Sequence, residues 1–155
     1  MEYLLVKWLH VLSSTVLFGT GLGSAFYLYF TNRSGDVRAI AIVTRRVVIA
    51  DWLFTTPTAI VQPLTGFWLA HLANMPWTGG WIFWSLVLYA VAGACWLPVV
   101  WMQVRMAAMA ERAAQAGEGL PPLFWRYHRL WTALGGPAFI AFIAIFFLMV
   151  VKPPV

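Results

Sequence analysis

The chain has 155 residues, of which 62% are hydrophobic and 10% are charged, and its formal net charge is +5. A soluble domain carries roughly 45–50% apolar and about 25% charged residues. This composition therefore excludes a soluble globular protein, a disordered chain and a nucleic-acid-binding domain. It predicts an all-α integral membrane protein whose first partner is the lipid bilayer. The lone Cys95 excludes a disulfide within the chain.

Four apolar runs are each long enough to cross a bilayer, which takes about 20 residues. They predict an integral membrane four-helix bundle in a single transmembrane domain over residues 1–155, with helices at about 4–30, 38–73, 79–116 and 123–151. The second and third helices are expected to extend beyond the bilayer, because residues 37–50 and 102–116 lack Gly and Pro. Kinks are expected at the prolines within the helices, namely Pro57, Pro63, Pro98 and Pro137.

The arginines gather in the two segments that join the first helix to the second and the third to the fourth, whereas the turn at 72–80 carries no charge. The positive-inside rule places such basic segments in the cytoplasm. Both termini are therefore expected on the periplasmic side of a bacterial inner (cytoplasmic) membrane. Tryptophans near the helix ends, Trp77, Trp81, Trp84, Trp125 and Trp131, are interpreted as interfacial anchors.

The first helix carries His10 near its outer end, on a face that continues through Ser14 and Gly21. One interpretation is close helix packing, with His10 hydrogen-bonded to a partner helix. The other is that neutral His10 ligates haem iron, since small residues below it leave room for a flat macrocycle. Gly19 and Gly23 form a small-xxx-small pair that permits a homodimer.

The second helix ends at His71, at the same predicted depth as His10. Two imidazoles at one level could supply both axial ligands of a b-type haem. However, His71 lies nine residues after Gln62, which is half a turn from that residue's face, and Pro63 makes the phase uncertain. The competing interpretation is an interfacial histidine in contact with water and headgroups.

Asp51 begins a polar stripe on the second helix that runs through Gln62. A carboxylate inside the membrane is a candidate functional group whose partner must be named. Arg126, His128 and Arg129 are predicted at the same inner level. Together with Asp51 they suggest a polar inner site. It is interpreted either as a structural ion pair or as a functional site that relays protons or contacts a quinone. His128 itself is read as part of a headgroup-level cluster or as a second contact to a haem.

The whole chain resembles domain-of-unknown-function family 2269, predicted bacterial integral membrane proteins. The residues that carry this resemblance are KWLHVLSSTVLFGTGLGSAFY, ADWLFTTPTAIVQPLTGFWLAHL, GACWLPVVWMQVRM and FWRYHRLWTALGGPAF. A more distant likeness is to HemJ-type protoporphyrinogen oxidases, which bind haem b. It rests on His10 in KWLH, on Pro57 with LTGFWL (64–69) and on MVVKPP (149–154). The polar groups of that family's third helix are absent, with Ser85 and then Cys95 or Trp96 in their place.

The residues and the resemblance together lead to a specific expectation. The chain is expected to bind haem b through His10 and His71 and to serve a redox or electron-transfer role as a membrane oxidoreductase. Two alternatives stay open. One is a HemJ-like enzyme with a tetrapyrrole substrate, and the other is a cofactor-free accessory or structural subunit.

Overall fold

The computed structural model describes residues 1–78 and 80–153, and within them the chain is helical, with no strand. The elements are α1 (Glu2–Ser34), α2 (Val37–Ala50), a π-helical turn η1 (Asp51–Thr55), α3 (Thr56–Leu72), α4 (Gly80–Ala116) and α5 (Pro122–Val151). Because α2, η1 and α3 follow one another without a break, the chain forms four helical rods, as predicted. The predicted start of the third rod at residue 79 lies outside the described residues.

The boundary between the first two rods follows from local chemistry. Gly35 ends α1 with φ 73°, a left-handed conformation that glycine adopts without strain. Asp36 then caps α2, because its carboxylate accepts hydrogen bonds from the backbone N–H groups of Arg38 at 2.9 Å and Ala39 at 3.1 Å. A two-residue connection is thus enough to reverse the chain direction.

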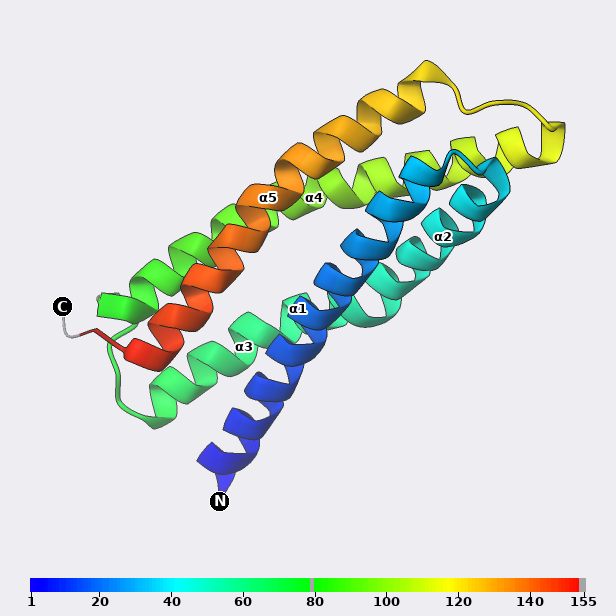
Figure 1. The fold of residues 1–155 in the computed structure, drawn as a ribbon. Helices are drawn as coiled ribbons and strands as arrows, with labels where there is room; N and C mark the ends of the chain where they lie inside the picture. The colour runs from blue at the N-terminus through cyan, green and yellow to red at the C-terminus, as the bar shows by residue number, and fades with distance from the viewer. Residues whose placement is uncertain (79, 154–155) are drawn as a thin grey trace.

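The rods form two pairs that diverge toward one end of the molecule (Figure 1). α1 packs along α2 and α3, α4 packs along α5, and α2 packs against α4, whereas α1 touches α5 only lightly. Both termini lie at the end where the pairs separate, and the connections after α1 and α4 lie at the opposite end (Figure 1). The prediction that both termini share one end is therefore confirmed.

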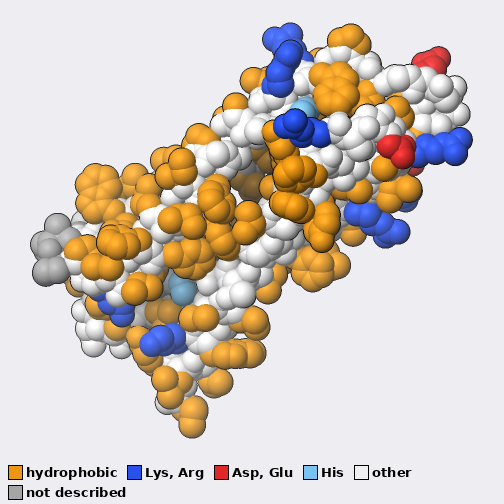
Figure 2. Space-filling view, viewed as in Figure 1, with side chains coloured by type: hydrophobic (Ala, Val, Ile, Leu, Met, Phe, Trp, Pro, Cys, Tyr) orange, Lys and Arg blue, Asp and Glu red, His pale blue; other side chains and the backbone are white. Residues whose placement is uncertain are grey.

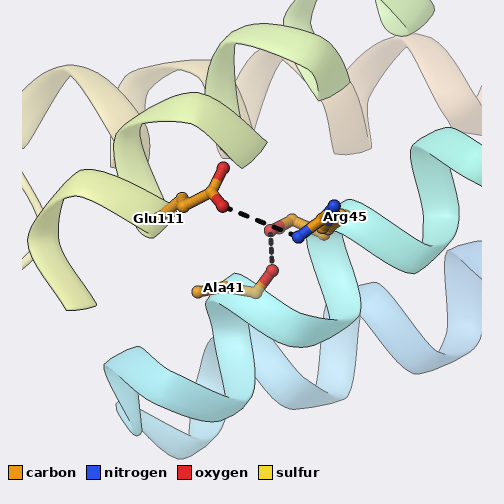
Figure 3. A network of polar contacts seen from close by, with 4 residues as sticks. Ala41, Arg45 and Glu111 are labelled. Carbon is orange, nitrogen blue, oxygen red and sulfur yellow. Dashed lines mark hydrogen bonds and ion pairs between the residues drawn. The ribbon is translucent and has the colours of Figure 1, made fainter. Parts of the chain in front are cut away.

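The tight core lies at the end of the connections. Its large, fully buried side chains are Leu28 from α1, Ile40 from α2, Met106 from α4 and Phe124 from α5, each with 0% exposure. The extensions predicted for the second and third rods meet here. A surface ion pair, Arg45 on α2 with Glu111 on α4 at 3.7 Å, joins these extensions (Figure 3).

Three of the described helices, α1, α4 and α5, are long and apolar enough to cross a membrane. The second rod is divided into segments of 14, 5 and 17 residues, each shorter than the roughly 20 that a span needs, although the continuous rod is long enough. Hydrophobic side chains cover much of the visible surface, and most of the visible Lys and Arg gather toward one end (Figure 2). Large apolar side chains such as Trp8, Leu53 and Ile140 are more than 60% exposed, as expected for contact with lipid tails.

Candidate functional site

Two cavities separate the α1–α3 pair from the α4–α5 pair. The terminal cavity, of about 440 Å³, lies toward the chain termini and is lined by His10, Gln62 and Lys152 among others. The central cavity, of about 740 Å³, lies farther along the rods and is lined by Asp51, Gln103 and Trp131 among others. Leu17, Tyr89 and Phe142 line both cavities, so the two adjoin. The cavities exist because α1 and α5 diverge instead of packing closely.

Two hydrogen bonds to α3 hold the His10 ring in the terminal cavity. The Nδ1 atom lies 2.8 Å from Thr65 Oγ1, and Nε2 lies 3.0 Å from the side-chain nitrogen of Gln62. The Thr65 hydroxyl already donates to the Val61 carbonyl at 2.7 Å, so it accepts from Nδ1–H. Nε2 therefore carries the lone pair and accepts from the Gln62 amide. His10 is thereby a neutral imidazole with its proton on Nδ1.

Ser13 and Gly66 complete this polar cluster. The Ser13 hydroxyl donates to Gln62 Oε1, so the amide of Gln62 is bound at both ends. A Cβ placed on Gly66 would stand 3.3 Å from His10 Cε1, which is tighter than an ordinary van der Waals contact, so glycine lets the ring lie this close to α3 without displacement. Of these contacts, the sequence indicated His10 and the polar stripe but not their pairing. The spacing in the sequence could have indicated this cluster, because Thr65 and Gly66 follow Gln62 by three and four residues and so share one helical face with it.

Ser14 and Gly21, predicted to lie below a cofactor at His10, are placed in different cavities. Ser14 lines the terminal cavity, with its hydroxyl turned back to the Val11 carbonyl at 2.8 Å. Gly21 lines the central cavity. A Cβ on Gly19, Gly21 or Gly23 would meet nothing within 4 Å. The close helix packing that these glycines suggested is therefore not made among the described residues.

His71 is not brought to His10. It lies in the last turn of α3, is exposed, and does not line the cavity that contains His10. The half-turn offset between Gln62 and His71 explains this placement, because Gln62 faces α1 and the opposite face of α3 looks outward. No cluster of three or more potential metal-ligating His, Cys, Asp or Glu side chains occurs among residues 1–78 and 80–153.

Asp51 is buried, but its neighbours are not the predicted ones. Its Oδ1 accepts from the Thr55 hydroxyl at 2.9 Å, and the Gln103 side chain of α4 lies beside the carboxyl. Arg126 and Arg129 are exposed on α5 and form no ion pair with Asp51 in the described part of the chain. An ion pair from Asp51 to α5 is thus not part of the structure, because the arginine side chains turn outward.

His128 joins α1 to α5 at the core end. It is 8% exposed, and its Nδ1 accepts from the side-chain amide of fully buried Asn32 at 3.1 Å. Its ring stacks on Trp131 with centroids 6.0 Å apart and planes 18° apart. His128 is therefore a packed core residue and not part of a headgroup-level cluster. Trp131, interpreted above as an interfacial anchor, is 6% exposed and belongs to the same core, so that prediction was wrong.

Two lysines line the terminal cavity near the end that holds the termini. Lys7 comes from α1, and Lys152 follows α5, with its ammonium group 5.7 Å from the centre of the Trp81 ring. The rest of the wall is largely apolar and includes Phe146 and Met149 of α5. The cavity thus combines an oriented imidazole, apolar walls and two cations.

Comparison with known proteins places the chain in a family without assigning an activity. No curated protein and no solved structure matches it. A family model described as "Predicted integral membrane protein (DUF2269)" matches residues 4–153, nearly the whole chain. The chain therefore belongs to the DUF2269 family of predicted integral membrane proteins.

Proposed function

We propose that this protein binds haem b in the terminal cavity, with Nε2 of His10 as an axial ligand, and serves a redox role in a bacterial inner membrane. The observation that carries the proposal is the 2.8 Å hydrogen bond from Nδ1 of His10, which lines that cavity, to Oγ1 of buried Thr65. Haem-ligating and metal-ligating histidines commonly use one ring nitrogen for such a bond and the other for the metal.

The walls of the terminal cavity suit the other parts of a haem. Lys7 and Lys152 could pair with the two propionates. The apolar side chains from α5 would cover the macrocycle and keep water away from it. Haem b bound there would supply one-electron redox chemistry, while the protein sets its ligand, burial and access. With the positive-inside rule, this cavity and both termini lie toward the periplasm.

Gln62 is the group that opposes haem ligation, because its amide donates to the same nitrogen that would bind iron. Ligation requires this amide to turn away. The closed network of His10, Gln62 and Ser13 favours a second candidate function, in which the cluster only fastens α1 to α3 and the protein is a cofactor-free accessory subunit. The two candidates differ in whether purified protein contains haem.

The second axial ligand distinguishes two further possibilities. The pairing of His10 with His71 stays a sequence prediction, since His71 lies outside the terminal cavity. Met149 lines the cavity on α5, and thioethers serve as axial ligands in some haem proteins. The variants His71→Ala and Met149→Leu decide between them, because loss of an axial ligand moves the reduced absorption bands.

Haem titration of apo-protein in detergent tests the proposal. Wild type is expected to bind one haem per chain, and His10→Ala is expected to lose this stoichiometric binding. Ser14→Ala is the matched control, since Ser14 lines the same cavity but bonds only its own helix. Equal binding by wild type and His10→Ala would exclude His10 as a ligand. Turnover of added porphyrinogen would instead favour the HemJ-like alternative, in which a tetrapyrrole is the substrate.

A further inference from the structure

The central cavity contains three buried polar atoms that have no hydrogen-bond partner. They are Oδ2 of Asp51, Oε1 of Gln103 and Nε1 of Trp131. The three side chains come from three different rods, are 4%, 5% and 6% exposed, and all line this one cavity. Unpaired buried polar atoms are costly and uncommon, so three of them around one cavity call for a partner.

The remaining wall of the central cavity is apolar and rich in aromatic rings. Phe18 of α1 stacks on Phe139 of α5 with centroids 5.4 Å apart, and the Phe142 ring lies 6.4 Å from that of Phe18. Gly93 of α4 and Gly136 of α5 also line it, and a Cβ on either would meet nothing within 4 Å. These small residues leave free space into which a flat ring could fit.

The cavity is reached from the hydrocarbon region. Leu22, Ile60 and Leu97 line it and are also 48%, 58% and 66% exposed. Side chains that face both the cavity and the outside mark an opening between rods, here among apolar residues. A ligand that enters this way must be uncharged and soluble in lipid.

We propose that the central cavity binds a lipid-soluble hydroquinone, whose ring lies among the aromatic side chains and whose hydroxyl pairs with the Trp131 indole N–H and with one of the two unpaired oxygens. The hydroxyl would donate to Gln103 Oε1 or to Asp51, and it would accept from the Trp131 indole N–H. This site does not depend on haem at His10, because His10 and Gln62 line the other cavity, and neither they nor Thr65 line this one.

The unpaired atoms select the reduced form of such a molecule. An amide oxygen only accepts hydrogen bonds and an indole N–H only donates them. A hydroxyl satisfies both kinds of atom. A quinone carbonyl satisfies only Trp131 and leaves Gln103 Oε1 buried and unpaired. The hydroquinone is therefore expected to bind more tightly than the corresponding quinone, by about tenfold for one hydrogen bond.

Equilibrium binding to purified protein tests the proposal with four probes, of which three share a decyl-substituted six-membered ring and one is a long-chain alcohol. They are a decyl-substituted hydroquinone, its quinone, its dimethyl ether and dodecanol. The hydroquinone is expected to bind about tenfold more tightly than the quinone and the ether, which keep the ring but lose the donor. Dodecanol has a hydroxyl and an alkyl chain but no ring, so its affinity shows whether the site requires the ring. Equal affinity for hydroquinone and ether, or tighter binding of dodecanol, would overturn the proposal.

Two substitutions locate the site. Gln103→Leu keeps the approximate shape of the side chain and Trp131→Phe keeps an aromatic ring, while each removes one unpaired atom, and both are expected to weaken hydroquinone binding about tenfold. Trp125→Phe is the control, because Trp125 lies in α5 outside the cavity. His10→Ala is expected to leave the affinity unchanged, so failure of the haem proposal would not disturb this result. Unchanged hydroquinone affinity in both Gln103→Leu and Trp131→Phe would refute the assignment. If a variant does not fold, the comparison of the four probes on wild-type protein still tests the proposal.

Discussion

The Cε1 atom of His10 lies 3.3 Å from the position that a Cβ on Gly66 would occupy. The imidazole therefore rests on the backbone of α3, where it reaches both Thr65 and Gln62. A histidine on α1 and a glycine on α3 together set how closely the two rods approach. The geometry of the terminal cavity depends on this contact.

Gly66→Ala is expected to destabilise the protein by about 1–3 kcal/mol, because the ring is held by two hydrogen bonds and cannot yield without stretching them. Thermal unfolding in detergent measures the effect. Gly93→Ala is the matched control, since its added Cβ meets nothing within 4 Å. Equal stability of Gly66→Ala and wild type, or an equal loss in both variants, would contradict the contact.

The side-chain amide of Gln62 donates a hydrogen bond to Nε2 of His10, the nitrogen that is proposed to bind haem iron. Gln62→Ala removes this competing amide. We expect this variant to bind haem at least as well as wild type under identical reconstitution, although its apo form loses about 1–3 kcal/mol of stability. Haem content per chain, measured after removal of free haem, checks the first expectation. A variant that is destabilised and has lost haem would show that Gln62 supports the cofactor instead of competing with it.

The Tyr89 hydroxyl donates to the Ala59 carbonyl at 2.6 Å. That carbonyl would normally accept from the residue four positions later, but residue 63 is proline and has no N–H. Tyr89→Phe is therefore expected to cost about 1 kcal/mol or more of stability. In a Pro63→Ala background the restored N–H should bind the carbonyl and reduce this cost. Thermal melts of the four proteins of the cycle measure the coupling, and a cost that is the same in both backgrounds would refute it.

His128→Phe keeps a ring against Trp131 but leaves the buried Asn32 amide without its acceptor. We expect a loss of about 1–3 kcal/mol with no change in haem content, because His128 lines neither cavity. Arg129→Leu, at the exposed neighbouring position, should stay within about 0.5 kcal/mol of wild type. Loss of haem in His128→Phe at unchanged stability would contradict this expectation and would indicate that His128 contacts the cofactor.

Much of the fold could be predicted from the sequence, because apolar run length and helix-breaking residues are local properties. The four rods, the extensions of the second and third rods, and the common end of the termini all follow from them. Helical spacing also predicts that Asp51, Gln62 and Thr65 lie on one face of the second rod. The π-helical turn at 51–55 rotates that face locally. Individual contacts depend on how the rods pair, which periodicity does not specify.

The errors share one physical cause, the use of depth in the membrane as a guide to contact. Arg126 and Arg129 lie at the predicted level of Asp51, yet their side chains turn outward and Gln103 takes the neighbouring place. Trp131 has the composition of an interfacial anchor, but the pairing of α4 with α5 buries it. The pairing of His71 with His10 stays a prediction, although His71 is exposed and lies outside the terminal cavity. Rotation about the rod axis, and not depth, decides these contacts.

The absorption spectrum of gently purified protein, oxidised and reduced, tests the central claim most directly. We expect a Soret band and sharp reduced α and β bands in wild type and in Gln62→Ala, and their absence in His10→Ala at comparable thermal stability. A colourless wild type from haem-replete cells would contradict it. The cluster at His10 would then be a fastening between α1 and α3 alone.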